Sequence, residues 1–288
     1  MNSIFGRLLN PLEPRRAEVL RNVAAVARQR STPFMLVGAY ARELHFFNVH
    51  GVEVVRKTGD VDISIQVRDW DAYNGFSAIL QHDYGYRPKT ADHPEKLIHE
   101  ALRQELDLLP FGEIAEDGQV KWPSDNSPWS VVGYNDAFAT ALTFRLESCE
   151  EIAVASIPAL VALKIVALHD RPDNRRKDAT DIAFIVANYL AVGNRERLVS
   201  GPDADILPSC ESDLDLASAV MIGRDMARFL GAEARALVTG YLQHEVKSGS
   251  RCYLVRGMIG TSFPKFERAR EVAAAFLRGL SGEGIVEG

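Results

Sequence analysis

The sequence predicts an α+β fold, in which a mixed β-sheet flanked by helices is followed by a mostly helical C-terminal region. Two observations predict this class. Up to about residue 156, short apolar runs alternate with Pro, Gly and Asn, as is typical of strands. From Asp178 onward, apolar residues recur at helical spacing instead. The chain has 288 residues, 47% of them hydrophobic, which is enough for two domains or one large unit.

The elements of the first half follow in order. An amphipathic helix is expected at residues 14–30, with Val19 and Val23 on its apolar side and arginines on the other. The apolar run 34–37 predicts a buried strand, and Gly38 begins a helix. Residues 60–67 form a strand and residues 69–81 a helix. Further strands are expected at 85–88, 97–102, 105–111, 119–123, 128–134, 143–147 and 151–156, with a short helical turn at 136–142.

Helices dominate the remainder of the chain. Pro158 lies in the first turn of a helix that runs to residue 170, where its missing N–H has little effect. Further helices are expected at 178–190, 213–230, 233–246 and 266–280. The Gly- and Pro-containing stretch 192–209 is the expected boundary between a first domain at residues 1–195, with its core at 30–190, and a helical region at 196–288.

Composition excludes several classes of protein. A net charge of −6 argues against a protein that coats nucleic acid by means of an overall positive electrostatic field. A local basic patch is compatible with this net charge. The three cysteines are odd in number and lack metal-binding spacing, which fits a reducing compartment. No signal peptide and no window of 18 apolar residues is present. We therefore expect a cytoplasmic protein without a membrane partner.

Two carboxylates lie one residue apart on the predicted strand 60–67. Asp60 and Asp62 therefore point to one face, while Val61, Ile63 and Ile65 point to the core. Two like charges this close repel each other unless a cation lies between them, and carboxylate oxygens are suitable ligands for divalent metal. Because the same pattern also occurs on solvated strand faces, its meaning depends on the neighbouring residues.

Two neighbouring features favour the metal interpretation. Asp107 lies on the predicted strand 105–111, on the face opposite Leu106 and Leu108, and is either a third metal ligand or a surface carboxylate. Gly38, at the junction of a strand and a helix, is a candidate phosphate contact because a helix N-terminus offers free N–H groups. A simple turn would explain Gly38 equally well.

Basic residues supply further candidates. Lys164 lies in a helix that is apolar on nearly every side, so its ammonium group must snorkel, pair with an acid or face a ligand. The segment 171–181 then combines Arg176 and Lys177 with Asp178 and Asp181. It is either a charged loop leading into a helix, with Asp178 near its N-terminus, or a site that holds triphosphate or RNA. Arg42, Arg56 and Lys57 lie near the acidic strand in sequence.

Sequence motifs for several enzyme classes are absent. The chain contains no GxSxG, Walker A, GxGxxG or HExxH motif. This argues against serine hydrolases, P-loop NTPases, dinucleotide-binding oxidoreductases and helical zinc proteases.

With these residues identified, the chain resembles the AbiEii/AbiGii-type nucleotidyltransferase toxins, within the DNA polymerase β-like nucleotidyltransferase superfamily. LVGAYAREL resembles the opening glycine–helix motif, RKTGDVDISI the R-x-T-x-D-h-D-h strand, where h is apolar, and LDLLPFGEI the strand of the third carboxylate. SIPALVALKIVALHDRPDNRRKDATDI resembles the downstream lysine helix and the R-x-KDxxD segment. The likeness spans roughly residues 30–190 and predicts a nucleotidyltransferase-like sheet.

The resemblance implies roles for individual residues. Asp60 and Asp62 would bind Mg²⁺, with Mn²⁺ as an alternative, and Asp107 would be the third ligand or the general base. Lys164 would contact the triphosphate, and Asp178 or Asp181 would be a supporting or catalytic acid. The nucleotide site would also include Gly38, Ala39, Arg42, Arg56, Thr58, Arg176 and Lys177. Ala39 departs from the Gly-Ser or Gly-Gly of many superfamily members, so backbone N–H groups would have to bind the phosphate there.

The resemblance implies a function as well. We expect a Mg²⁺-dependent nucleotidyltransferase that moves NMP from an NTP to an acceptor, with tRNA as the acceptor and an antitoxin protein as the partner. One alternative keeps the chemistry but places the nucleotide on a protein side chain or a small molecule. Another is a catalytically silent protein that binds a nucleotide or a partner.

Overall fold

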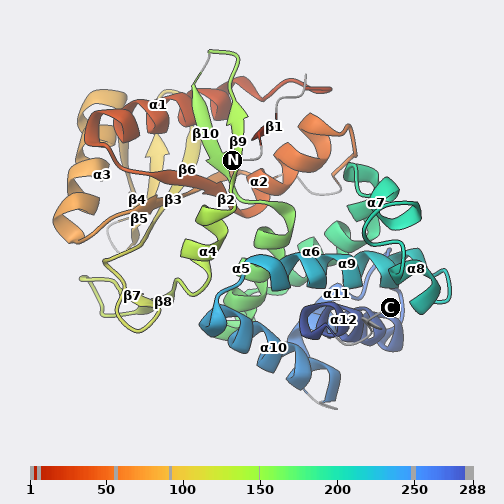
Figure 1. The fold of residues 1–288 in the computed structure, drawn as a ribbon. Helices are drawn as coiled ribbons and strands as arrows, with labels where there is room; N and C mark the ends of the chain where they lie inside the picture. The colour runs from red at the N-terminus through yellow and green to blue at the C-terminus, as the bar shows by residue number, and fades with distance from the viewer. Residues whose placement is uncertain are drawn as a thin grey trace. The chain divides into compact units, whose positions relative to one another are not determined.

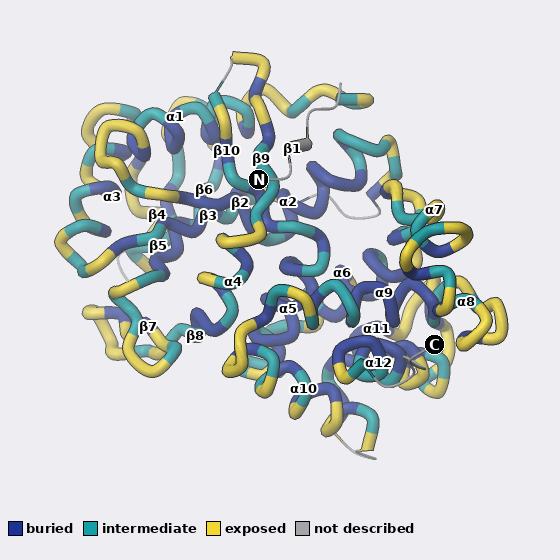
Figure 2. The backbone as a smooth tube through the Cα atoms, in the orientation of Figure 1, coloured by how far each residue is buried: buried dark blue, intermediate teal, exposed yellow. Residues whose placement is uncertain are grey.

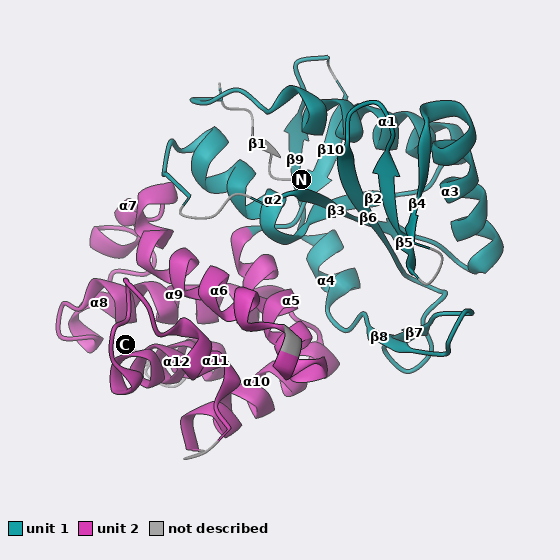
Figure 3. Cartoon of the chain, turned by 180° about the vertical axis from the view of Figure 1, so that it is seen from behind, with its two compact units in different colours: residues 1–156 teal, residues 157–288 magenta. Residues whose placement is uncertain are grey.

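We analysed a computed structural model of the chain, which describes residues 3–4, 8–54, 58–90, 93–148, 150–247 and 251–282. The chain divides into two compact units, residues 1–156 and residues 157–288 (Figure 3). This division differs from the expected boundary at residue 195. Helices that were expected in the first domain belong structurally to the second unit, whereas the functional extent 1–195 remains a proposal.

The first unit is built on a mixed sheet of eight strands in the order β1-β9-β10-β2-β3-β6-β5-β4 (Figure 1). Parallel pairs join β10 to β2 and β3 to β6, whereas β2 and β3 are antiparallel. The strands are β1 (Ser3–Ile4), β2 (Phe34–Val37), β3 (Asp60–Gln66), β4 (Tyr86–Thr90), β5 (His93–His99), β6 (Gln104–Phe111), β9 (Leu142–Arg145) and β10 (Glu151–Val154), with a separate hairpin of β7 (Gln119–Lys121) and β8 (Pro128–Ser130).

Helices accompany this sheet, so the predicted α+β class is confirmed. They are α1 (Pro14–Arg30), α2 (Gly38–Glu43), α3 (Trp70–Tyr84) and α4 (Tyr134–Ala139). Helix α2 continues directly into a π-helix, η1 (Leu44–Val49). Helix α1 contacts α3, β6 and β10, and α3 contacts β4. Asp69 accepts a hydrogen bond from the Ala72 N–H at 2.8 Å and so caps the start of α3.

The predicted alternation of the central strands is confirmed. Val61, Ile63, Leu106 and Leu108 are fully buried, and the register pairs the first with the third and the second with the fourth. In Figure 2, the central strands β2, β3 and β6 run mostly through buried positions. The acidic positions between the apolar ones therefore share the opposite face of the sheet.

The second unit is helical. Its elements are α5 (Ile157–Asp170), η2 (Pro172–Asn174), α6 (Arg176–Asn188), η3 (Tyr189–Val192), α7 (Arg195–Val199), α8 (Ile206–Ser209), α9 (Leu214–Phe229), α10 (Ala232–Lys247), α11 (Tyr253–Met258) and α12 (Phe266–Ser281). Helices α9 and α12 approach closely at Gly223 and Gly279. A Cβ on Gly223 would lie 2.4 Å from the Phe276 carbonyl oxygen, so only glycine permits this packing.

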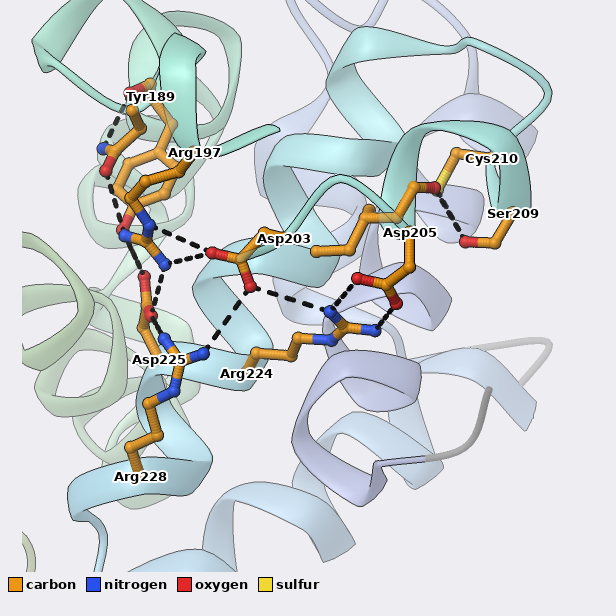
Figure 4. Close-up of polar contacts among 11 residues, drawn as sticks. Tyr189, Arg197, Asp203, Asp205, Ser209, Cys210, Arg224, Asp225 and Arg228 are labelled. Carbon is orange, nitrogen blue, oxygen red and sulfur yellow. Dashed lines mark hydrogen bonds and ion pairs between the residues drawn. The ribbon is translucent and has the colours of Figure 1, made fainter. Parts of the chain in front are cut away.

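The stretch 192–209, expected to be a boundary, is instead held inside the second unit by ion pairs (Figure 4). Asp203 is fully buried and accepts hydrogen bonds from Arg197 at 2.7 and 3.0 Å. Arg197 also donates to Asp225 on α9, which accepts a further bond from the Tyr189 hydroxyl at 2.7 Å. Such a network between distant segments cannot be read from local composition. No helix in the described part of the chain is both long and apolar enough to cross a membrane.

Candidate metal centre

Three carboxylates converge on neighbouring strands of the first unit. The parallel register of β3 and β6 pairs Asp62 directly with Asp107, and Asp60 lies two positions earlier on the same face of β3. One ligand atom from each of the three lies within 4.8 Å of the others. Among the described residues, no other group of three His, Cys, Asp or Glu side chains has this spacing. The sequence-predicted triad is therefore brought together.

The electrostatics of the triad favour a bound cation. Burial raises the pKa of Asp107 to about 6, Lys96 opposes the rise, and Asp60 adds to it. Lys96 pairs with Asp107 across β5 and β6, so its positive charge lies beside the triad without removing the repulsion between the carboxylates. A divalent cation would relieve that repulsion directly. The donor set therefore fits a metal that prefers oxygen ligands, such as Mg²⁺ or Mn²⁺.

Gly38 is required by its contact with the triad. Its φ of +70° lies in the left-handed region, and a Cβ at this position would lie 2.1 Å from Asp62 Oδ2. Val37, the preceding residue, pairs with Asp62 across β2 and β3. The first turn of α2 therefore begins directly beside a metal-ligand candidate. This close approach is a physical reason for glycine that the sequence alone did not distinguish from a simple turn.

Asp60 is oriented by a chain of buried polar contacts. The Thr58 hydroxyl donates to Asp60 Oδ1, and the Thr58 carbonyl accepts from Arg16 on α1. Arg16 also pairs with Glu43 at 2.9 Å and lies over the Tyr40 ring, 4.8 Å from its centroid. These contacts fix the backbone immediately before β3.

The role of Arg16 was missed from the sequence, where all arginines of the opening helix were placed on its polar side. That placement is wrong for Arg16, which is 8% exposed. Its spacing of three, four and seven residues from the buried Val19, Leu20 and Val23 is the signal that could have identified it.

The other nucleotide-binding candidates of the first unit differ in accessibility. Ala39 follows Gly38 within α2 and is largely buried, and Arg42 on the same helix is 3% exposed. A side chain this buried presents little surface to a ligand, so the predicted contact through Arg42 is weakened. Arg56 and Lys57 lie outside the described residues.

Lys164 lies in the second unit, where it pairs with two carboxylates. Its Nζ donates to Asp178 Oδ1 and Asp181 Oδ2, each at 2.8 Å. Burial alone lowers the pKa of Lys164, but the two carboxylates outweigh burial and raise it above its ordinary value. Of the three expected options, pairing with an acid is therefore the one observed.

The remaining candidates lie at the start of α6. Arg176 and Lys177 are exposed in its first turn, and Asp178 follows them as the acidic residue expected near a helix N-terminus. Arg175 approaches Asp178 to 3.6 Å. Two exposed cations therefore directly precede Asp178, whose carboxylate already forms an ion pair with Lys164.

Comparisons with known proteins give limited information. No family model and no curated protein matches the sequence. A crystal structure of ANT(2″)-Ia in complex with adenylyl-2″-tobramycin is similar with a TM-score of 0.37 and 16% identity, over 63% of this chain and 98% of that one. A solution structure of the antibiotic-resistance factor ANT(2″)-Ia gives 0.32 and 15%, over 56% and 76%. At this level of similarity, function has to be argued from the residues of this chain.

Proposed function

We propose that the chain is a divalent-metal-dependent nucleotidyltransferase. The observation that carries the proposal is the convergence of Asp60, Asp62 and Asp107 within 4.8 Å on adjacent strands. The start of α2 at Gly38 lies against one of these carboxylates, that of Asp62. Oxygen ligands for a divalent cation beside backbone N–H groups that suit phosphate are what an NTP and its metal require.

In this proposal the residues of the first unit hold the metal, orient the phosphates and activate the acceptor. Asp60 and Asp62 hold the metal, with Thr58 fixing the orientation of Asp60. Asp107 is a third ligand or accepts the proton of the attacking hydroxyl, and its raised pKa suits proton acceptance near neutral pH. Bound Mg²⁺ or Mn²⁺ would neutralise phosphate charge and lower the pKa of the attacking hydroxyl. Backbone N–H groups at Gly38 and Ala39 would orient the phosphates.

The second unit would supply the positive charge. The resemblance would make Lys164 a triphosphate contact; because its buried ammonium group is already paired with Asp178 and Asp181, it would have to exchange one of these carboxylates for phosphate. The exposed Arg176 and Lys177 would bind further phosphate groups of the nucleotide or of the acceptor. These assignments follow from the likeness to the AbiEii/AbiGii-type toxins.

The acceptor proposed first is the tRNA end, with the chain acting as a toxin that an antitoxin protein neutralises. The net charge of −6 resides entirely in residues 1–156, because acidic and basic residues are equal in number in residues 157–288. An RNA acceptor would therefore have to be held by local basic residues, such as Arg176 and Lys177. A protein or small-molecule acceptor needs no basic field, and a silent binding protein would need no acceptor.

A labelling experiment tests the proposal. Purified protein is incubated with each α-labelled NTP and Mg²⁺ or Mn²⁺, and offered in turn tRNA, cellular protein and a small-molecule extract. The proposal predicts metal-dependent label in one acceptor class, no label with the Asp60→Ala, Asp62→Ala double variant, and unchanged label with Glu151→Gln, which alters an exposed carboxylate on β10. Label in the tRNA fraction would support the toxin assignment, and label elsewhere would replace it. Two results together would contradict the enzymatic proposal. One is the absence of label in every fraction, and the other is nucleotide binding that is the same with and without metal and the same for the wild type and the double variant.

A further inference from the structure

A cavity of about 680 Å³ lies within the helical unit, and the proposed function uses none of its side chains. We call it the α10 pocket. It is bounded by the end of α5, by η2, by one side of α10 and by the segment that leads into α11. The lining residues that carry chemistry are His169, Asp173, Tyr241, His244, Glu245 and Tyr253.

The floor of the pocket carries a buried carboxylate that lacks a counter-ion. Glu245 is fully buried, and its Oε2 accepts a hydrogen bond from the Val255 N–H at 3.1 Å. Its Oε1 makes no hydrogen bond, and no basic side chain in the described part of the chain forms an ion pair with Glu245. An isolated carboxylate removed from water is strongly destabilising unless a cation or several donors compensate it.

A buried hydroxyl accompanies this carboxylate. The Tyr241 hydroxyl lies close enough to interact with the Glu245 carboxylate and with the Leu254 backbone, but neither this hydroxyl nor Glu245 Oε1 has a described partner in full hydrogen-bond geometry. Burial, and then the Glu245 carboxylate, raise the pKa of Tyr241 far above its ordinary value. The pocket floor therefore offers a carboxylate oxygen and a neutral hydroxyl to a donor-bearing ligand.

The walls and rim are aromatic and acidic. The rings of His169 and Tyr241 meet edge to face with centroids 6.0 Å apart. At the rim, the Asp173 carboxylate accepts a hydrogen bond from the Tyr253 hydroxyl and raises the pKa of Tyr253. Arg251 is the single lysine or arginine among the lining residues, so carboxylates outnumber permanent cations. Aromatic faces beside carboxylates favour organic cations.

Gly240 leaves open space on the side of α10 that lines the pocket. It lies inside α10 and lines the pocket, and a Cβ added there would meet no atom within 4 Å. A glycine inside a helix is about 1 kcal/mol less favourable than alanine. Gly240 is exposed, so the space beside it is open to solvent and leaves room for a ligand in the pocket.

We propose that the α10 pocket binds an organic ammonium ligand, a protonated aliphatic amine. The ammonium group pairs with Glu245 Oε1 on the floor and contacts the Tyr241 and His169 rings. The aliphatic part lies against the backbone of Gly240. A second ammonium group on a diamine or polyamine reaches the acidic rim at Asp173. This site is separate from the carboxylate triad, and its occupancy does not depend on the nucleotidyltransferase proposal.

Spermidine binding to the full-length protein, measured by calorimetry at about 0.15 M salt to screen surface charge, tests the proposal. We expect one saturable site. Glu245→Gln should weaken binding at least about tenfold, because it removes the counter-ion. Gly240→Leu should weaken binding by occupying the part of the pocket beside α10 without removing any polar group. Glu233→Gln, an exposed acidic residue on the same helix, is the matched control and should bind like the wild type.

Two results would overturn the inference. One is the absence of saturable binding of spermidine, putrescine or tetramethylammonium by the wild type. The other is binding that survives both Glu245→Gln and Gly240→Leu, which would assign the amine to the acidic surface. Circular dichroism verifies that each variant is folded, and because Gly240→Leu replaces a helix-interior glycine, it keeps the test valid even if Glu245→Gln fails to fold.

Discussion

Replacing Asp107 with asparagine should stabilise the metal-free protein while weakening its response to metal. In the folded protein the pKa of Asp107 is about 6, against an ordinary value of 3.8. The folded state therefore keeps a proton that the unfolded state has already released between these two pH values. By linkage, stability falls as pH rises from about 4 to about 6 and stays low above that range.

The size of the effect follows from the same pKa values. Each pH unit between the folded and unfolded pKa values corresponds to about 1.4 kcal/mol. The rise from 3.8 to about 6 therefore means that ionised Asp107 destabilises the metal-free first unit by about 3 kcal/mol at neutral pH. Asparagine has nearly the same shape without the charge, and no hydrogen bond to Asp107 is found among the described residues. Asp107→Asn should therefore recover most of this free energy.

Urea unfolding at pH 4, 5, 6 and 7, in EDTA and in Mg²⁺, measures the effect. In EDTA the wild type should lose stability across this range, whereas Asp107→Asn should show a flatter profile and be more stable at pH 7. Added Mg²⁺ should stabilise the wild type more than the variant, which keeps only Asp60 and Asp62 as ligands. Glu151→Gln is the control for removing an exposed strand carboxylate. A variant that is no more stable than wild type at pH 7 in EDTA, with the same pH profile, would refute the reasoning.

Three further predictions concern the carboxylate triad and the ion pairs of Lys164. The Asp60→Ala, Asp62→Ala double variant should lose the Mg²⁺ dependence of NTP binding, measured by calorimetry; retained dependence would place the metal elsewhere. Gly38→Ala should destabilise the protein by about 1–3 kcal/mol, because its Cβ overlaps Asp62, whereas Gly59→Ala, where a Cβ meets no atom within 4 Å, should not; equal unfolding midpoints would contradict the overlap. Lys164→Met should cost about 3–5 kcal/mol by removing the buried cation that Asp178 and Asp181 share, against less than about 0.5 kcal/mol for the exposed Lys177→Met; similar urea midpoints for both would show that the buried pair is not stabilising.

Local patterns were sufficient for the elements that carry the triad. Alternation in residues 60–66 and 104–111 predicts both strands and the face of each carboxylate, because side chains in a strand alternate strictly. The register that pairs Asp62 with Asp107 depends on strand order, which no local pattern specifies. The sequence likeness supplied the expectation that these strands are neighbours.

Long-range polar contacts account for what the sequence did not reveal. Arg16 binds Thr58, 42 positions further along the chain, and Glu43, 27 positions further along. Because it lies in an arginine-rich helix, the sequence pattern indicated a surface residue. The stretch 192–209 has the composition of a linker, yet Arg197 and Asp203 tie it to Asp225 on α9. Composition and periodicity do not predict ion pairs between distant segments.

The central claim is that the carboxylates of Asp60, Asp62 and Asp107 together bind a divalent cation that accompanies an NTP. Its most direct test is a crystal structure of the protein soaked with MnCl₂ and a non-hydrolysable NTP analogue, with anomalous scattering recorded for manganese. We predict an anomalous peak between the three carboxylates, bridged to phosphate oxygens of the analogue. An ordered analogue bound without manganese at these carboxylates, or manganese only at other sites, would contradict the account.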